Sequence, residues 1–289
     1  MTRPTSAGGF RRLSDILEGG LPPLAWLAEP ILTTDALGVI GAAPKGFKSW
    51  MLGDLVVSVC TGVPWLGAFK SGRMGPVLLV SPEGGLRGLT RRIEAILQPL
   101  GGIPSDLSIA FVRSRSLALT DARDLGDLRA ACATERPALV ANDSIYAGLD
   151  GVGTTRLSEF GAALRNLSDA ASEVDAAVVT THHLNAKEGA GLHRLTGAGP
   201  AEWASAVLIG TPGARMVVAG TTSATVHWAL TARDVPEIGF STAFSIGAQD
   251  PADMSSPIDY RVSVAAVVAS VIASQWVMEI GRASCRERV

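Results

Sequence analysis

The sequence predicts an α/β fold with a mainly parallel β-sheet, helices on both faces of the sheet and antiparallel strands at one edge. Uncharged, apolar runs alternate with amphipathic runs over the first two-thirds of the chain, a pattern typical of parallel sheets. Later β-like runs follow one another closely, which indicates the antiparallel edge. With 289 residues, 47% of them hydrophobic, the chain is long enough for one large or two small domains and too apolar for disorder.

The elements follow in order from this pattern. We expect residues 1–30, rich in Pro, Gly and Arg, to form an arm or linker. The expected strands are 37–40, 77–81, 109–112, 138–142, 176–181, 206–209, 216–220 and 225–230, and the expected helices are about 48–61, 86–100, 125–134 and 155–172. The most apolar stretch, 262–278, is short for a membrane span and is interrupted by serines, so it predicts a buried helix.

Charge and cysteine content exclude several classes of protein. The 25 basic and 27 acidic residues give a net charge of −2, which excludes a strongly basic nucleic-acid binder but not a local basic patch. The three cysteines, Cys60, Cys132 and Cys285, are isolated and show neither metal-binding spacing nor a disulfide framework. This pattern suits a reducing compartment, and no signal sequence opens the chain, so we expect a cytoplasmic protein that does not enter a membrane.

The last eleven residues, 279–289, differ in character from the chain before them. Three arginines and two glutamates follow a stretch that has had no charge since Arg261. The string EIGRASCRERV resembles an in-frame translation of a sequencing adapter, so we expect the native sequence to stop near Met278. Residues 236–278 would then be a linker and the start of a truncated C-terminal region.

A candidate phosphate-binding loop joins the first expected strand to the first expected helix. It reads GAAPKGFKSW, and its expected binding residues are Gly41, Ala42, Ala43, Pro44, Lys45, Gly46, Phe47, Lys48, Ser49 and Trp50. Backbone N–H groups, a lysine and a hydroxyl for Mg²⁺ are what such a loop supplies. Lys48 and Ser49 match, but Phe47 stands at the second glycine position and Ala42 at the first. An ordinary strand-to-helix turn with a lysine near its end remains the alternative.

Two carboxylates follow expected strands, and two histidines end a third. Glu83 follows 77–81, Asp143 follows 138–142, and His182 and His183 close the strand from 176. The carboxyl ends of parallel strands share one edge, where ligands bind. The alternatives are an acid that favours a helix N-terminus for Glu83 and a turn-forming Asn142–Asp143 pair. Because neighbouring strand residues face opposite sides, only one of His182 and His183 can reach the site.

Two segments carry a resemblance to a known family. APKGFKSWM (residues 43–51) and CTGVPWLG (60–67) resemble the RecA-like P-loop ATPases of the RepA replicative-helicase type, relatives of KaiC and DnaB. The likeness covers roughly residues 24–232 and implies a RecA-like ATPase domain at 31–235 that uses ATP and Mg²⁺. It implies that Lys48 and the loop hold phosphates, and that Ser49 and Asp143 bind the metal.

The resemblance also implies the remaining catalytic roles. Glu83 would be the general base that orients water, and His183 would sense the γ-phosphate. Arg194 would be an arginine finger that reaches a neighbour's nucleotide, although Thr196 stands at the expected position and a solvated loop arginine is an equal alternative. Arg215 is the next candidate for the finger.

The same resemblance implies partners. It favours a hexameric ring of identical chains that moves on single-stranded DNA, contacted by loops near 148–155 and 184–195. Lys187 and Arg194 are the only basic residues of those loops, which is sparse for a helicase. The alternatives are a KaiC- or RecA-like regulatory or recombination ATPase without unwinding, and a weakly hydrolysing nucleotide-binding scaffold, for which Phe47 and Asn142 argue.

Overall fold

The computed structural model describes residues 12–20, 23–101, 110–148, 157–184, 195, 199–248, 250, 252–253 and 256–269. Its centre is a nine-stranded sheet in the order β12-β11-β10-β9-β3-β8-β7-β5-β6. The strands are β3 (Leu37–Ala42), β5 (Val77–Val80), β6 (Ala110–Arg113), β7 (Leu139–Asn142), β8 (Ala177–His183), β9 (Ala206–Val218), β10 (Thr221–Ala232), β11 (Ile238–Ile246) and β12 (Tyr260–Ala269). The strands from β9 to β6 are parallel, and β9 to β12 are antiparallel to one another, so the predicted fold class is confirmed.

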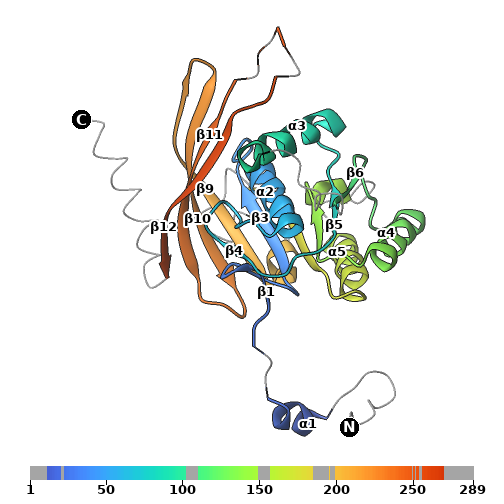
Figure 1. Ribbon diagram of the computed structural model, residues 1–289. Coiled ribbons are helices and arrows are strands. Elements are labelled where there is room, and N and C mark those ends of the chain that lie inside the picture. The colour runs from blue at the N-terminus through green and yellow to red at the C-terminus, as the bar shows by residue number, and fades with distance from the viewer. Residues whose placement is uncertain are drawn as a thin grey trace.

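Helices cover both faces of the sheet (Figure 1). The larger ones are α2 (Lys48–Thr61), α3 (Gly85–Leu97), α4 (Ala122–Glu135) and α5 (Leu157–Ser172); α1 (Leu13–Glu18), α6 (Pro200–Trp203) and the 3₁₀ turns η1 (Gln98–Leu100) and η3 (Ile145–Gly148) are short. Alternate strand residues serve the two sides: Leu79 joins the core under α2 and α3, whereas Leu78 joins the core under α4 and α5. The parallel strands are therefore apolar on both faces, which is why they read as unbroken hydrophobic runs.

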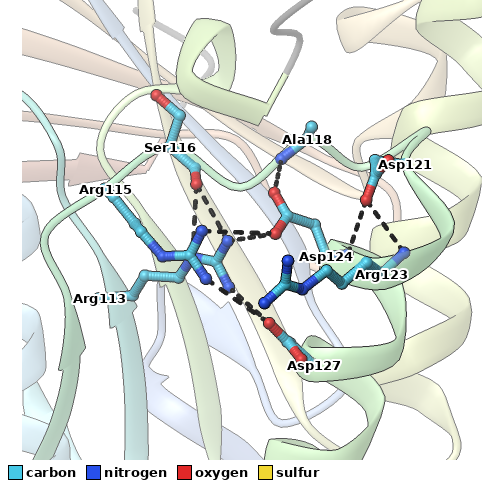
Figure 2. Close-up of polar contacts among 8 residues, drawn as sticks. All are labelled: Arg113, Arg115, Ser116, Ala118, Asp121, Arg123, Asp124 and Asp127. Carbon is cyan, nitrogen blue, oxygen red and sulfur yellow. Dashed lines mark hydrogen bonds and ion pairs between the residues drawn. The ribbon is translucent and has the colours of Figure 1, made fainter.

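Helix α4 begins with a side-chain cap and an ion-pair network (Figure 2). The Asp121 carboxylate accepts hydrogen bonds from the backbone N–H groups of Arg123 and Asp124, each at 3.0 Å. Asp124 accepts from the N–H of Ala118 at 2.8 Å and pairs with Arg113 at the end of β6. The Ala118 N–H bond, and then Arg113, lower the pKa of Asp124. These contacts fix the start of α4 to the edge strand.

The antiparallel part of the sheet is longer than the sequence suggested. Residues 216–220 are expected to form a separate strand, but residues 216–218 instead end β9, which runs unbroken through Pro212 and Gly213. Residues 219–220 form the turn to β10. The pairing with β10 becomes irregular between Ala224, which lies opposite Arg215, and Val226, which lies opposite Pro212. At this point β9 has one residue more than β10, so the strand continues through a Pro-Gly pair that otherwise looks like a strand break. Figure 1 shows the long strands β9, β10 and β11 standing along one side of the molecule.

The prediction of a buried helix at 262–278 is wrong where the structure describes it, because residues 260–269 form β12. Burial alternates along this strand: Tyr260 is buried and Val262 and Val264 are half-buried, whereas Arg261 and Ser263 are exposed. That period of two is typical of a strand with one covered face, and the richness in valine favours it. Residues 270–289, including the adapter-like end, lie outside the described residues. Strands β11 and β12 thus continue the sheet past the expected domain end at 235.

The last part of the expected N-terminal arm belongs to the folded unit. Strand β1 (Trp26–Glu29) pairs with β2 (Leu32–Thr33) and β4 (Lys70–Ser71) in a small antiparallel sheet. Leu27 and Ala28 of β1 are fully buried in the core beneath α2. Within the described ranges, no helix has the length and apolar character needed to cross a membrane.

Candidate functional site

A cavity of about 340 Å³ lies at the carboxyl ends of β3, β5, β7 and β8. Most of the residues expected to bind or react line it, together with three residues of β9, β10 and β11. The lining consists of Lys45, Gly46, Phe47, Lys48, Ser49, Trp50, Glu83, Arg92, Asp143, Thr181, His183, Arg215, Thr222 and Ile246. The topology explains the gathering, since parallel strands end at one edge and the long antiparallel strands close the other side.

The first part of the phosphate loop (residues 41–50) contributes backbone rather than cavity lining. Gly41 and Ala42 are the last residues of β3, and the Ala42 and Ala43 carbonyls accept hydrogen bonds from Lys48. Pro44 is not among the residues that line the cavity. At Gly46 a Cβ atom would lie 2.8 Å from the Ala43 carbonyl oxygen, so the loop closes on itself only with glycine there.

Phe47 stands where the usual phosphate-loop pattern has its second glycine. Its backbone is left-handed, with φ 64° and ψ 12°, the conformation that glycine adopts without steric cost. Phe47 therefore occupies the glycine position of the motif in the glycine conformation. Its carbonyl accepts the first helical hydrogen bonds of α2, from Trp50 and Met51.

Lys48 is buried, with 6% of its surface exposed, and its ammonium group donates hydrogen bonds to the backbone of the loop. Its Nζ donates to the carbonyls of Ala42 at 2.9 Å and Ala43 at 3.0 Å. Burial lowers the pKa of Lys48, and the nearby carboxylates of Asp143 and Glu83 oppose this effect. Two carbonyl acceptors and two nearby carboxylates favour the charged form of Lys48, which is the form that phosphate recognition requires.

Ser49 and Asp143 come together as the sequence predicts. The Ser49 hydroxyl donates to Asp143 Oδ1 at 3.1 Å, and the Thr181 hydroxyl donates to the same oxygen at 2.7 Å. These hydroxyl and carboxylate oxygens are hard ligands that suit Mg²⁺, which takes few protein groups and fills its shell with phosphate and water. Among the described residues no cluster of three or more His, Cys, Asp or Glu could form an all-protein metal cage. The donor set therefore fits Mg²⁺ bound together with a phosphate ligand.

Glu83 lies across the cavity on the loop between β5 and α3. The Ser144 hydroxyl donates to Glu83 Oε1 at 3.0 Å, and Ser144 directly follows Asp143. One segment after β7 thus supplies both a metal-type carboxylate and a partner that orients Glu83. A carboxylate held by one oxygen keeps its second oxygen for a water molecule.

The two histidines at the end of β8 have different surroundings. His183 lines the cavity, and its Nδ1 lies 3.3 Å from Lys48 Nζ. Since the ammonium only donates, Nδ1 accepts and the proton of the neutral ring is on Nε2. Burial, and then Lys48, lower the pKa of His183, so the ring is neutral at pH 7. His182 is fully buried on the other side, with its ring centroid 5.2 Å from that of Tyr146.

Sequence reasoning missed four residues that line the cavity: Arg92, Thr181, Thr222 and Ile246. Two of them, Arg92 and Thr181, contact Asp143. Thr181 stands two residues before His183 on the same face of β8, so strand periodicity could have found it. Arg92 of α3 lies with its Nη1 3.7 Å from Asp143 Oδ2 and its Cζ 5.8 Å from the Trp50 ring centroid. Its position depends on how α3 packs, and no spacing in the sequence indicates it.

The arginines expected as fingers fall in two places. Arg215 lines the cavity of its own chain, from the exposed half of β9. Arg194 lies outside the described residues, as do Lys187, Thr196 and most of the expected DNA-contacting loops. The DNA and ring predictions therefore stay predictions.

Comparison with family models identifies a family for most of the chain. A family model described as an AAA domain matches residues 8–189, which is more than half of the chain and includes the phosphate loop, Glu83, Asp143 and His183. No curated protein matches the chain.

Proposed function

We propose that this chain, which belongs to the AAA domain family of P-loop ATPases, is a Mg²⁺-dependent ATP hydrolase. The reaction would take place in the cavity above β3, β5, β7 and β8. The observation that carries the proposal is the convergence of Lys48, Ser49, Glu83 and Asp143 on this one cavity. These four come from three separate loops and provide a cation, a metal ligand pair and a base, which are the groups that phosphoryl transfer to water requires.

The loop and Lys48 would hold the phosphates. The N-terminus of α2 begins at Lys48 and offers N–H groups and the positive end of its dipole to an anion. Lys48 adds a fixed charge, and the His183 Nε2–H adds a neutral donor in the same cavity. These donors therefore gather at the end of the cavity where β3 meets α2.

Glu83 would orient the attacking water. Ser144 holds Glu83 Oε1, so the other oxygen can accept a proton from water in line with the outer phosphate. Ser49 and Asp143 are the residues that would hold Mg²⁺. When bound, this ion neutralises charge that develops on the phosphate oxygens. Arg92, whose Nη1 lies 3.7 Å from Asp143 Oδ2, would hold that carboxylate in place.

The test is phosphate release from ATP with and without Mg²⁺. The wild-type chain should hydrolyse ATP only with Mg²⁺, and Lys48→Ala should lose both nucleotide binding and turnover. Lys70→Ala removes an exposed lysine of β4 that lies outside the cavity, so it should behave as wild type. Micromolar ATP binding by Lys48→Ala would overturn the phosphate-loop assignment.

We also propose, on the resemblance of residues 43–51 and 60–67 to the RepA type, that the hydrolysis drives a ring helicase on single-stranded DNA. Single-stranded DNA should then raise ATP turnover several-fold, and a forked duplex should be unwound. Turnover that single-stranded DNA does not change would instead support a regulatory ATPase of the KaiC kind. Nucleotide binding with negligible turnover would support a scaffold.

A further inference from the structure

We propose that β11 and β12 position the phosphate loop through two aromatic stacks, with Phe244 and Tyr260 as the positioning residues. Phe244 of β11 stacks on Phe47, and Tyr260 of β12 stacks on Trp50. Lys48 and Ser49 lie between the two stacked loop residues. The inference rests on the proposed nucleotide site and assigns to it two residues that lie outside the family match, which ends at 189.

The first stack supports a backbone conformation that phenylalanine disfavours. Phe47 has φ 64°, in the left-handed region where a Cβ atom crowds the following carbonyl. Its ring lies 4.6 Å from the Phe244 ring, with 3° between the planes. Phe244 is itself 2% exposed and fixed within the sheet. The sheet therefore supplies the contact that keeps Phe47, and with it the start of α2, in the left-handed form.

The second stack leads from β12 to the metal carboxylate. The Trp50 and Tyr260 rings lie 4.7 Å apart with 8° between their planes. Tyr260 is anchored from beneath, because its hydroxyl donates to Asp54 Oδ2 at 3.4 Å. The Arg92 guanidinium lies over the Trp50 ring, and it also pairs with Asp143. Each member of this series contacts the next, so the position of β12 fixes where Arg92 meets Asp143.

The expected effect on affinity depends on the fraction of molecules in the binding shape, the loop conformation in which Phe47 is left-handed. A glycine loop reaches the left-handed form freely, whereas Phe47 reaches it with help from Phe244. If loss of the stack leaves about a tenth of the molecules in the binding shape, the apparent Kd rises about tenfold. The maximal rate at saturating ATP changes little, because the nucleotide itself then selects the shape.

The experiment is titration of the chain with a fluorescent ATP analogue and Mg²⁺, together with ATP turnover. Phe244→Leu should weaken binding about tenfold and raise KM with kcat nearly unchanged, while Phe244→Tyr, which keeps the ring, should bind within about twofold of wild type. Phe47→Gly should restore the affinity of Phe244→Leu in the double variant, because glycine needs no support. Tyr260→Leu should weaken binding more than Tyr260→Phe, which keeps the stacked ring and loses only the hydrogen bond to Asp54.

The matched control is Phe240→Leu, which truncates a buried ring of the same strand that contacts Phe69 and Trp228 and not the loop. It should lower stability and leave affinity unchanged. If Phe244→Leu does not fold, Phe47→Leu removes the same stack from its half-buried side and should show the same tenfold loss.

Three outcomes would overturn the inference: wild-type affinity in folded Phe244→Leu, an equal loss in Phe240→Leu, or no restoration by Phe47→Gly. A wild-type chain that binds no nucleotide would instead refute the proposed function, and the inference with it.

Discussion

Single side chains in the cavity are held in place by partners that have no reactive role of their own. Ser144 donates to Glu83, and Thr181 donates to Asp143, so each carboxylate has one oxygen fixed. Glu83→Gln therefore preserves the shape and the Ser144 contact while it removes the base. We expect the variant to bind ATP as tightly as wild type and to lose hydrolysis by 10²-fold or more, on the order of what general-base catalysis contributes. Nucleotide titration and phosphate release separate the two effects, and weakened binding would show Glu83 to be structural.

Asp54 gives a second prediction, in the pH dependence of stability. Its side chain accepts from the Leu66 N–H at 2.7 Å and from Tyr260, and burial raises its pKa to about 6. The unfolded value is about 4, so between pH 4 and 6 the folded chain binds more protons than the unfolded one. Stability contributed by this group is therefore present at low pH and is lost as the pH rises through about 6.

Asp54→Asn should remove that dependence. The unfolding free energy of wild type, relative to the variant, should fall by about 2 kcal/mol from pH 4 to pH 7, because most of a shift of about two pKa units is expressed over this range. Urea unfolding of both chains across this range measures it. Parallel curves for the two chains would mean that Asp54 does not titrate in the folded state.

How far the sequence predicts the site depends on where each residue lies. Asp143 directly follows β7, and His183 is the last residue of β8. Glu83 and Lys48 lie a few residues beyond the ends of β5 and β3. Because strand ends share an edge, the sequence alone predicts that these side chains meet. Arg92 lies near the middle of α3, away from any strand end. Its approach to Asp143 depends on how α3 packs against Trp50. The position of a residue along a strand can be predicted from the neighbouring sequence, whereas the way in which a helix packs on the rest of the fold cannot.

At the scale of an element, the start of α4 gives a prediction independent of nucleotide chemistry. Asp121 satisfies two backbone N–H groups that have no partner within the helix. Asp121→Ala should cost about 1 kcal/mol of unfolding free energy, and Asp121→Ser should recover most of it. Chemical denaturation measures this, and ATP turnover below the unfolding range should stay at the wild-type level. A loss of turnover in the folded variant would link α4 to the cavity.

The elements themselves were predictable where one pattern dominates. The helix expected at 48–61 is found with those bounds, because an apolar run follows the loop and Gly62, with φ 77°, ends it. The high apolar content of residues 262–269 favours a buried helix, but these residues form a strand. The alternating burial of Tyr260, Val262 and Val264 depends on pairing with β11. The continuity of β9 through Pro212 likewise depends on β10. Pairing between strands is therefore what the sequence leaves open.

For the whole molecule, the prediction concerns assembly. If Arg194 acts on a neighbour's nucleotide, chains with Arg194→Ala and chains with Glu83→Gln are each inactive alone. In a mixture, an interface that takes Glu83 from the first variant and Arg194 from the second has both groups intact. Mixed assemblies should then hydrolyse ATP, which phosphate release after mixing would measure.

The control is proof that the two variants assemble together, for example by differently tagged chains. A co-assembled mixture that stays inactive would remove Arg194 from the trans role. Arg215, which lines the cavity of its own chain, would then be tested as a group acting in cis.

The contact between Tyr260 and Asp54 joins residues 206 positions apart, and this separation has a consequence for synthesis. A ribosome makes the phosphate loop early and its aromatic supports last, with an interval of roughly 10–40 s at ordinary rates of elongation. Through that interval the nascent chain carries a loop that lacks Phe244 and Tyr260. If the two stacks position the loop as proposed, the unfinished chain would bind nucleotide about tenfold more weakly than the finished one. Binding of nucleotide would then favour chains in which the last strands have already joined the sheet.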